Sequence, residues 1–191
     1  MDIKGRKLES ITKEDFFQSY NYSIGGVPIS HKPCEGLVVE LVYTKYRLKS
    51  SIELGTWQGG LSILLTLMTE GNFLTVDIQD FCFPLAKKVM EKFGAEFKLL
   101  NIFDWENTKK VFTESRQFKT GRTLFYVDNG NKFKELQLIA DMVREDDIVI
   151  AHDHGVEWNY SDLGKDFALV PIETEIIANL NSTQLVLRKR S

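Results

Sequence analysis

The sequence predicts an α/β fold of the doubly wound, Rossmann-like type, with a mostly parallel seven-stranded sheet and a C-terminal antiparallel strand pair. Short apolar runs alternate with segments in which apolar residues recur every three or four positions, a pattern typical of parallel strands and their covering helices. A glycine-rich turn separates the first apolar run from the first helical segment. Two further strand-like runs close the pattern, joined by a short polar stretch, and these predict the antiparallel pair.

The core is expected to contain five parallel strands, four helices and two closing strands. Strands of the parallel sheet are expected at 51–54, 73–76, 96–100, 123–127 and 147–151. Helices are expected between them, at 60–69, 83–93, 106–115 and 132–144. The two closing strands are expected at 167–173 and 183–188. Each helix carries apolar residues on one face, which we expect to cover the sheet.

The residues before the core predict helices and a loop. A helix start is indicated at Thr12, and an amphipathic helix over 35–48 is expected to bury a face with Leu37, Leu41 and Leu48. Between them, the Gly-Gly-x-Pro segment 23–30 is either a lid over a ligand or a plain connector. At 191 residues we expect a single domain. Its two parts are an N-terminal helical and lid segment, 1–49, and a ligand-binding core, 50–191.

Composition excludes several classes of function. A formal net charge of −3 offers no clustered positive charge for nucleic acid. Cys34 and Cys82 lie far apart in no metal or redox spacing, which favours free thiols in a reducing compartment. No apolar run has the length of a bilayer span, and the N-terminus lacks the apolar core of a signal peptide. We therefore expect a cytoplasmic protein with neither membrane nor nucleic-acid partners, and a chain this short is compatible with a homodimer.

The segment from Ser51 to Gly60 is an apolar strand that contains Glu53 and runs into a turn with three glycines. Such turns let the backbone approach a nucleotide-like ligand, and the following helix points its first N–H groups at the turn. The spacing lacks the glycine at position 57 that a pyrophosphate-binding fingerprint requires, and no Gly-Lys-Ser/Thr follows. A smaller nucleoside without phosphates fits this turn better.

The octapeptide Glu53-Leu-Gly-Thr-Trp-Gln-Gly-Gly60 resembles the first motif of the class I S-adenosylmethionine-dependent methyltransferases, an acidic residue followed by Gly-x-x-x-Gly. A second segment, Asp128-Asn-Gly-Asn-Lys132, narrows the resemblance to the macrocin O-methyltransferase, rhamnosyl O-methyltransferase and cephalosporin hydroxylase-like group. The resemblance spans roughly residues 50 to 155. It implies S-adenosylmethionine as the cofactor and a hydroxyl group as the methyl acceptor.

The cofactor is expected beyond the carboxyl ends of the strands, where ligands bind in open α/β sheets. Asp77 closes the second strand, where an acidic side chain can accept hydrogen bonds from both ribose hydroxyls; the simpler interpretation is a helix cap. The resemblance implies that Glu53 and Ser62 position the methionine end, although Glu53 can equally be a strand residue satisfied by backbone amides. The complete set of expected cofactor-binding residues is Glu53, Gly55, Thr56, Trp57, Gly59, Gly60, Ser62, Asp77, Ile78, Asn101, Ile102, Phe103 and Asp128, of which Ile78, Asn101, Ile102 and Phe103 would border the adenine.

A metal site is predicted where the fourth and fifth strands end, because Asp128 and Asp153 would converge there beside His152 and His154. Two hard carboxylate oxygens suit Mg²⁺ or Mn²⁺ better than Zn²⁺. The arrangement resembles the catechol-type O-methyltransferases, which implies Asp128, Asp153 and His154 as ligands, with His154 at the place of an asparagine. Two independent helix caps are the simpler alternative.

The resemblance also implies Lys132 as a catalytic base, together with Asp128 and His154, provided that the site depresses the pKa of the lysine. A solvated lysine at the start of a helix is the alternative. Trp158 and Tyr160 either wall the acceptor pocket or pack in the core. His31 is expected to be a surface residue of the lid.

The sequence thus predicts an S-adenosylmethionine-dependent O-methyltransferase, assisted by a divalent metal ion, that acts on a small molecule or on a sugar or glycan. The alternatives are a cofactor-binding module without methyl transfer and a hydroxylase-like enzyme on the same fold.

Overall fold

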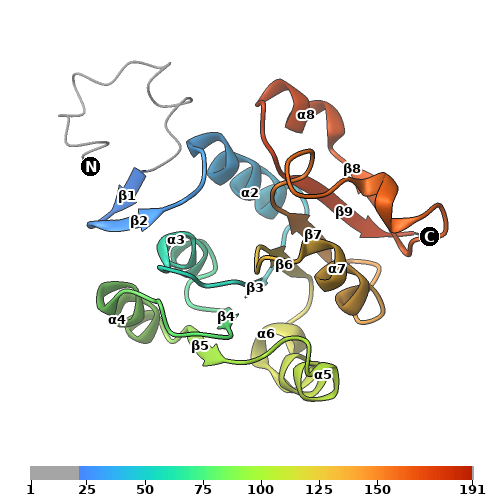
Figure 1. Cartoon of the computed structure of the whole chain (residues 1–191). Coiled ribbons are helices and arrows are strands. Elements are labelled where there is room, and N and C mark those ends of the chain that lie inside the picture. Colours follow the sequence, from blue (N-terminus) through green and yellow to red (C-terminus); the bar gives the residue numbers. More distant parts are fainter. Residues whose placement is uncertain (1–21, 191) are drawn as a thin grey trace.

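The computed structural model describes residues 22–190, and a mixed sheet with the strand order β5-β4-β3-β6-β7-β9-β8 lies at its centre (Figure 1). The five parallel strands are β3 (Ser50–Leu54), β4 (Phe73–Asp77), β5 (Glu96–Leu99), β6 (Thr123–Val127) and β7 (Ile148–Ala151). The strand β9 (Leu185–Lys189) pairs antiparallel with both β7 and β8 (Leu169–Ile172). The predicted Rossmann-like class, with its C-terminal antiparallel pair, is confirmed.

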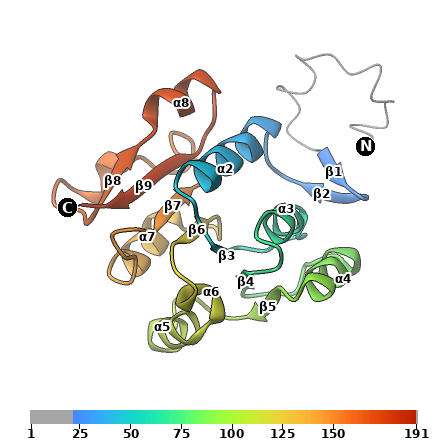
Figure 2. The ribbon, with the colours of Figure 1, turned by 180° about the vertical axis from the view of Figure 1, so that it is seen from behind.

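Helices cover both faces of this sheet (Figures 1 and 2). One face packs against α2 (Pro33–Lys45), α3 (Gly60–Met68) and α4 (Pro84–Phe93), and the other against α5 (Trp105–Glu114), α6 (Arg116–Lys119) and α7 (Lys132–Ala140). The remaining short helices are η2 (Tyr160–Leu163) and α8 (Thr174–Asn179). None of the helices in this part of the chain is long and apolar enough to cross a bilayer.

The central strand β6 shows why the strands read as unbroken apolar runs. Leu124 and Tyr126 pack into the core on the side of α2, α3 and α4, whereas Phe125 and Val127 pack into the core on the side of α5 and α7. Successive side chains of a strand point to opposite faces, so a sheet covered on both faces needs apolar residues at every position.

Two of the predicted helices differ from the structure. In α2 the buried face carries Val38, Val39 and Val42, while Leu41 is 49% exposed. Leu48 is buried as expected, but the helix ends at Lys45, before this residue. The helix α7 ends at Ala140 instead of Arg144. Arg144 lies in the following turn, where its backbone N and its Nε both donate to Asp147 Oδ2 at 2.9 Å. The expected helix start at Thr12 lies outside the described residues.

The segment interpreted as a lid or a connector forms an antiparallel hairpin of β1 (Tyr22–Ile24) and β2 (Val27–Ile29). Gly25 and Gly26 make its turn, both with positive φ. The hairpin packs against the start of α3 so closely that a Cβ atom on Gly60 would lie 2.1 Å from the carbonyl oxygen of Pro28. This contact fixes the position of the chain that continues into His31.

Candidate functional site

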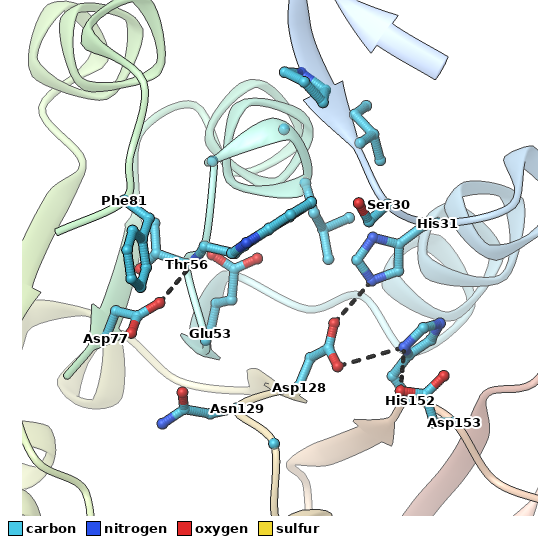
Figure 3. A pocket seen from close by; sticks show the side chains of 18 of the residues that line it. Ser30, His31, Glu53, Thr56, Asp77, Phe81, Asp128, Asn129, His152 and Asp153 are labelled. Atoms are coloured by element: carbon cyan, nitrogen blue, oxygen red, sulfur yellow. Dashed lines mark hydrogen bonds and ion pairs between the residues drawn. The ribbon is translucent and has the colours of Figure 1, made fainter. Parts of the chain in front are cut away.

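A cavity of about 770 Å³ opens at the carboxyl ends of the central strands, where the strand order reverses between β3 and β6 (Figure 3). This is the place where open α/β sheets bind their ligands. One end of the cavity is lined by the glycine turn after β3 and the loop after β4. The other end is lined by the chain that follows β2 and by the ends of β6 and β7.

The glycine turn needs its glycines for close packing. A Cβ atom on Gly55 would lie 2.4 Å from the carbonyl oxygen of Asp128, and Gly55 has a φ of 100°. Gly59 also has a positive φ, of 85°, and a Cβ atom there would lie 2.7 Å from the Cβ atom of Ala86. Trp57 adopts a φ of 43° without being a glycine, and its backbone N donates to Asp77 Oδ2 at 2.8 Å. The turn is therefore tied directly to the end of β4.

Asp77 lines the cavity and is buried. Its second carboxylate oxygen, Oδ1, accepts a hydrogen bond from the backbone N of Gln79 at 3.2 Å. Backbone amides thus hold the carboxylate in one orientation. Asp77 caps no helix, so the simpler interpretation of this residue as a helix cap is wrong. Each oxygen keeps capacity for a further hydrogen bond from a ligand.

Glu53 is almost fully buried at the floor of the cavity. Its Oε2 accepts hydrogen bonds from Ser62 Oγ at 2.5 Å and from Thr75 Oγ1 at 2.6 Å. Burial raises the pKa of the Glu53 carboxyl to about 8. Thr56 Oγ1 lies 2.6 Å from Thr75 Oγ1 and extends this network to the turn. Ser62 does not line the cavity, so it contacts Glu53 and not the space that a ligand would fill.

The residues expected to border an adenine lie in two different environments. Ile78 lines the cavity, whereas Asn101, Ile102 and Phe103 do not. Ile102 is 2% exposed and packs in the core, and Asn101 Oδ1 accepts from the backbone N of Phe103 within a local turn. The structure instead places Phe81, which is 56% exposed, at the cavity beside Asp77 (Figure 3). The sequence analysis missed Phe81, although its place shortly after Asp77 was a usable signal.

The polar end of the cavity is a cluster of two imidazoles and two carboxylates (Figure 3). His31 Nε2 lies 3.1 Å from Asp128 Oδ2, and His152 Nδ1 lies 3.4 Å from Asp128 Oδ1 and 3.2 Å from Asp153 Oδ2. Burial favours the neutral acid of Asp128, but the two imidazoles hold its pKa well below the usual range. His31 is only 8% exposed, so its prediction as a surface residue was wrong. The hairpin turns the chain inward at this point.

His154 lies apart from this cluster and does not line the cavity. Its backbone N donates to the carbonyl oxygen of Thr183 at 2.7 Å, and its ring packs edge-on against Trp158. Asp153 has a φ of 58°, and this left-handed residue directs His152 to the cavity and His154 away from it. The structure therefore does not bring His154 together with Asp128 and Asp153.

Trp158 and Tyr160 belong to the core and not to the cavity wall. Trp158 is buried, and its Nε1 donates to the carbonyl oxygen of His152 at 2.6 Å. Tyr160 donates its hydroxyl to the carbonyl oxygen of Leu169. Trp158 therefore holds the backbone just after β7, and Tyr160 contacts the start of β8.

Lys132 is buried and bridges three carboxylates. Its Nζ lies 3.1 Å from Asp128 Oδ1, 3.0 Å from Asp153 Oδ2 and 2.8 Å from Glu157 Oε2. Burial lowers the pKa of Lys132, but the carboxylates outweigh this effect and raise the pKa above its usual value. The surroundings of Lys132 thus favour its ammonium form, whereas a catalytic base would need a depressed pKa.

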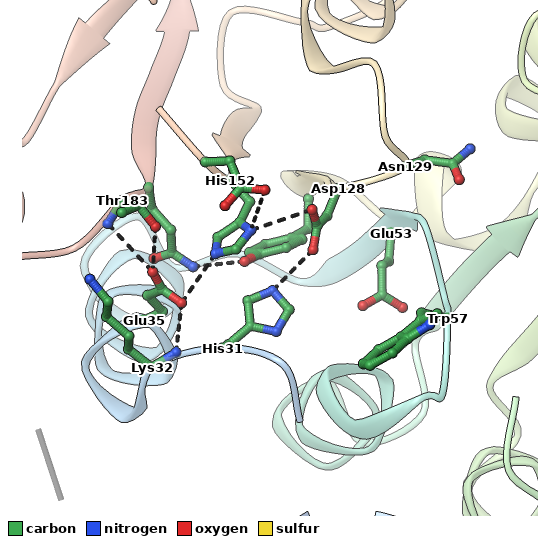
Figure 4. A network of polar contacts seen from close by, with 12 residues as sticks. His31, Lys32, Glu35, Glu53, Trp57, Asp128, Asn129, His152 and Thr183 are labelled. Atoms are coloured by element: carbon green, nitrogen blue, oxygen red, sulfur yellow. Dashed lines mark hydrogen bonds and ion pairs between the residues drawn. The ribbon is translucent and has the colours of Figure 1, made fainter. Parts of the chain in front are cut away.

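A further carboxylate, Glu35 of α2, supports the cluster from behind (Figure 4). Glu35 Oε2 lies 3.2 Å from His152 Nε2 and accepts from the backbone N of Lys32 at 2.8 Å, while its Oε1 accepts from Thr183 Oγ1 at 2.7 Å. Burial raises the pKa of Glu35, but His152 and Thr183 outweigh it and keep the carboxyl ionised. Sequence analysis missed this residue, since an acid in the first turn of a helix is usually a solvated one.

No family model matches the sequence, and no curated protein matches it. Solved structures that share its fold include CmcI with S-adenosylhomocysteine, at a TM-score of 0.65 and 18% identity over 96% of this chain and 87% of that one. CmcI with Mg-SAM gives 0.62 and 19%, over 97% and 81%. An O-methyltransferase from Bacillus cereus with SAH gives 0.53 and 12%, over 83% and 81%.

These comparisons identify the fold. The chain has the fold of the class I S-adenosylmethionine-dependent methyltransferases, and the resemblance stated from the motifs at Glu53 and Asp128 is confirmed at that level.

Proposed function

We propose that this protein is an S-adenosylmethionine-dependent methyltransferase that transfers a methyl group to a hydroxyl of a small molecule or a sugar, assisted by a divalent metal ion. One observation carries the proposal: a single cavity joins the glycine turn and Asp77 at one end to the cluster of Asp128, His31 and His152 at the other. The shared fold with an O-methyltransferase that binds SAH and with CmcI, which binds Mg-SAM, supports it.

The glycine-turn end suits the cofactor. Asp77, oriented by two backbone amides, is the proposed acceptor for the ribose hydroxyls. Ile78 and Phe81 offer apolar surface for the adenine. Glu53 faces the proposed position of the methionine amino group, where a positive charge would stabilise its ionised form. Gly55 and Gly59 both line the cavity, so the backbone of the turn is within reach of the ligand.

The polar end suits the acceptor. The cofactor, when bound, supplies an electrophilic methyl group on a sulfonium, and a divalent ion, when bound, lowers the pKa of a hydroxyl beside it. The protein must then hold the acceptor oxygen in line, which supplies much of the rate. Asp128 faces the cavity with its pKa held low, so its role is to orient a hydroxyl or a cation and not to remove a proton. Lys132 keeps Asp128 and Asp153 in place.

Calorimetry tests the cofactor assignment. The purified protein is titrated with S-adenosylhomocysteine, and we expect micromolar binding that Asp77→Ala weakens at least about tenfold, since two ribose hydrogen bonds are lost. Asp80→Ala is the matched control, because Asp80 is exposed, pairs with Lys87 and does not line the cavity. No binding to the unmodified protein overturns the proposal.

Methyl transfer is then measured with labelled S-adenosylmethionine and a panel of sugars, glycans and phenols, with added divalent ions and with chelator. Transfer to a hydroxyl supports the proposal. Cofactor binding without transfer to any acceptor class would instead identify a cofactor-binding module.

A further inference from the structure

We propose that His31, Asp128 and His152 bind an imidazole-preferring transition ion of the Zn²⁺ or Co²⁺ kind, in preference to Mg²⁺, and that Glu35 orients His152 for this role. The inference rests on the proposed function only in placing the ion beside the methyl acceptor. The metal site itself is argued from the geometry of the cluster.

The carboxylate pair that would suit Mg²⁺ already holds a cation. Lys132 Nζ lies about equally far from Asp128 Oδ1, at 3.1 Å, and from Asp153 Oδ2, at 3.0 Å, and it also contacts Glu157. A metal ion placed between Asp128 and Asp153 would meet the full charge of a buried ammonium. The other oxygen of Asp128, Oδ2, faces His31 instead. The space available to an ion therefore lies on the histidine side of Asp128.

The three proposed ligands converge there. Each offers one ligand atom, and these atoms lie within 4.8 Å of one another. Around a tetrahedral ion with bonds of about 2.0–2.2 Å, neighbouring ligand atoms are about 3.3 Å apart. His31 Nε2 lies 3.1 Å from Asp128 Oδ2 and His152 Nδ1 lies 3.4 Å from Asp128 Oδ1, so each ring is about this far from one oxygen of the same carboxylate. Only small side-chain movements would be needed to close the three ligands around an ion.

The two imidazoles are also buried, and most of their nitrogens lack a hydrogen bond. His31 and His152 are 8% and 7% exposed. Among the described residues, His31 Nδ1, His31 Nε2 and His152 Nδ1 form no hydrogen bond of acceptable geometry. Buried nitrogens in that state are rare because they have lost their hydration, and a bound ion is one of the groups that satisfies them. His31 Nε2 and His152 Nδ1 are the two nitrogens that face Asp128 (Figure 4).

Glu35 completes an arrangement found behind metal-bound histidines. A ligating histidine usually donates its second nitrogen to a carboxylate, which fixes the ring and its tautomer. Glu35 Oε2 lies 3.2 Å from His152 Nε2, which leaves Nδ1 for the cavity. Thr183 Oγ1 and the backbone N of Lys32 hold Glu35 in turn. Glu35 is thus a positioning residue.

The donor set selects the ion. Two imidazoles and one carboxylate suit Zn²⁺ and Co²⁺, whereas Mg²⁺ requires oxygen ligands in a nearly octahedral array. Three protein ligands leave a fourth position open, as in catalytic zinc sites. His31, Asp128 and His152 all line the cavity, so the open position is within reach of an acceptor hydroxyl.

The test is a titration of the full chain with Co²⁺, followed by visible absorption, because the d–d bands report four-coordinate geometry. We expect binding that Zn²⁺ reverses and excess Mg²⁺ does not. His31→Ala should weaken Co²⁺ binding at least about tenfold, and Glu35→Gln about 10- to 100-fold through the orientation of His152. His154→Ala is the matched control and should leave the affinity unchanged, because His154 lies outside the cluster. Circular dichroism melting curves verify that each variant is folded.

Three results would overturn the inference: no Co²⁺ binding, equal competition by Mg²⁺, or an unchanged affinity in His31→Ala. Calorimetry with S-adenosylhomocysteine on the same samples separates this failure from a failure of the proposed function. If the cofactor analogue binds and Co²⁺ does not, the metal inference alone is wrong. If Co²⁺ binds and the analogue does not, the metal site stands without the methyltransferase assignment.

Discussion

The two ends of the cavity are built in different ways. The glycine-turn end is local, because Glu53, the turn and Asp77 belong to one strand-helix-strand unit. The polar end is assembled from distant segments: His31 after the hairpin, Glu35 in α2, Asp128 after β6 and His152 after β7. A local site is visible as a motif, whereas an assembled site requires the whole sheet to form. The two ends should therefore respond differently to mutation.

The largest effect on stability is expected at Gly55, where the glycine turn contacts the backbone of Asp128. In Gly55→Ala, the new Cβ atom would meet the carbonyl oxygen of Asp128 in a backbone conformation that alanine rarely adopts. Crowding and strain together should lower the free energy of unfolding by about 3 kcal/mol. Chemical denaturation measures this. Gly94→Ala, with a φ of 77° and no atom within 4 Å of its Cβ position, should cost only about 1 kcal/mol. Equal losses in the two variants would contradict the close contact.

The second-largest effect on stability is expected at Lys132, which lies at the polar end of the cavity. Lys132→Met leaves the carboxylates of Asp128, Asp153 and Glu157 without their shared ammonium, and the free energy of unfolding should fall by about 2 kcal/mol, less than for a fully buried pair. Lys87→Met breaks an exposed pair with Asp80 and should cost less than about 0.5 kcal/mol. Chemical denaturation at neutral pH compares the two. A loss in Lys132→Met no larger than in Lys87→Met would show that the ammonium contributes no stability to the polar end.

The glycine-turn end should show its own pH dependence. The pKa of Glu53 is raised to about 8 in the folded protein, so the folded state binds this proton more tightly than the unfolded state, and stability contributed by Glu53 falls as the pH rises from about 4.5 to 8. Glu53→Gln should flatten the stability profile in this window, whereas Glu91→Gln, an exposed change, should not. Thermal melting from pH 5 to 9 measures the stability profile of each variant. Parallel profiles in Glu53→Gln and the unmodified protein would contradict the raised pKa.

The smallest effect is expected for Phe81, an exposed residue that lines the cavity beside Asp77. Phe81→Ala should weaken the binding of S-adenosylhomocysteine about tenfold, through lost stacking, without changing stability, since Phe81 is exposed. Phe93→Ala, also exposed but outside the cavity, is the control. Calorimetry measures both variants. If they bind equally well, Phe81 is not part of the adenine site.

The sequence predicted the fold and the position of the glycine turn, but not all of the residues that line the cavity beside it. Apolar runs that need cover on both faces, as in β6, identified the parallel strands, and the glycine spacing after Glu53 located the turn. The polar end was predicted only in part. Asp128 and Asp153 were expected at strand ends with His152 and His154 beside them. The left-handed backbone at Asp153, which separates the two histidines, is only weakly indicated by an aspartate, because most aspartates adopt other conformations. His31 required knowledge of how the hairpin packs on Gly60, a tertiary contact that periodicity does not encode.

The position of Glu35 has one more consequence, for local unfolding. Its carboxylate joins the first turn of α2 to Thr183, just before β9, across 148 positions of the chain. Amide hydrogen exchange in α2 and in the segment around Thr183 should therefore be correlated, because opening of either one releases the shared carboxylate. The same opening frees the ring of His152. The position of His152 in the cavity wall thus depends on the cooperativity of two peripheral segments.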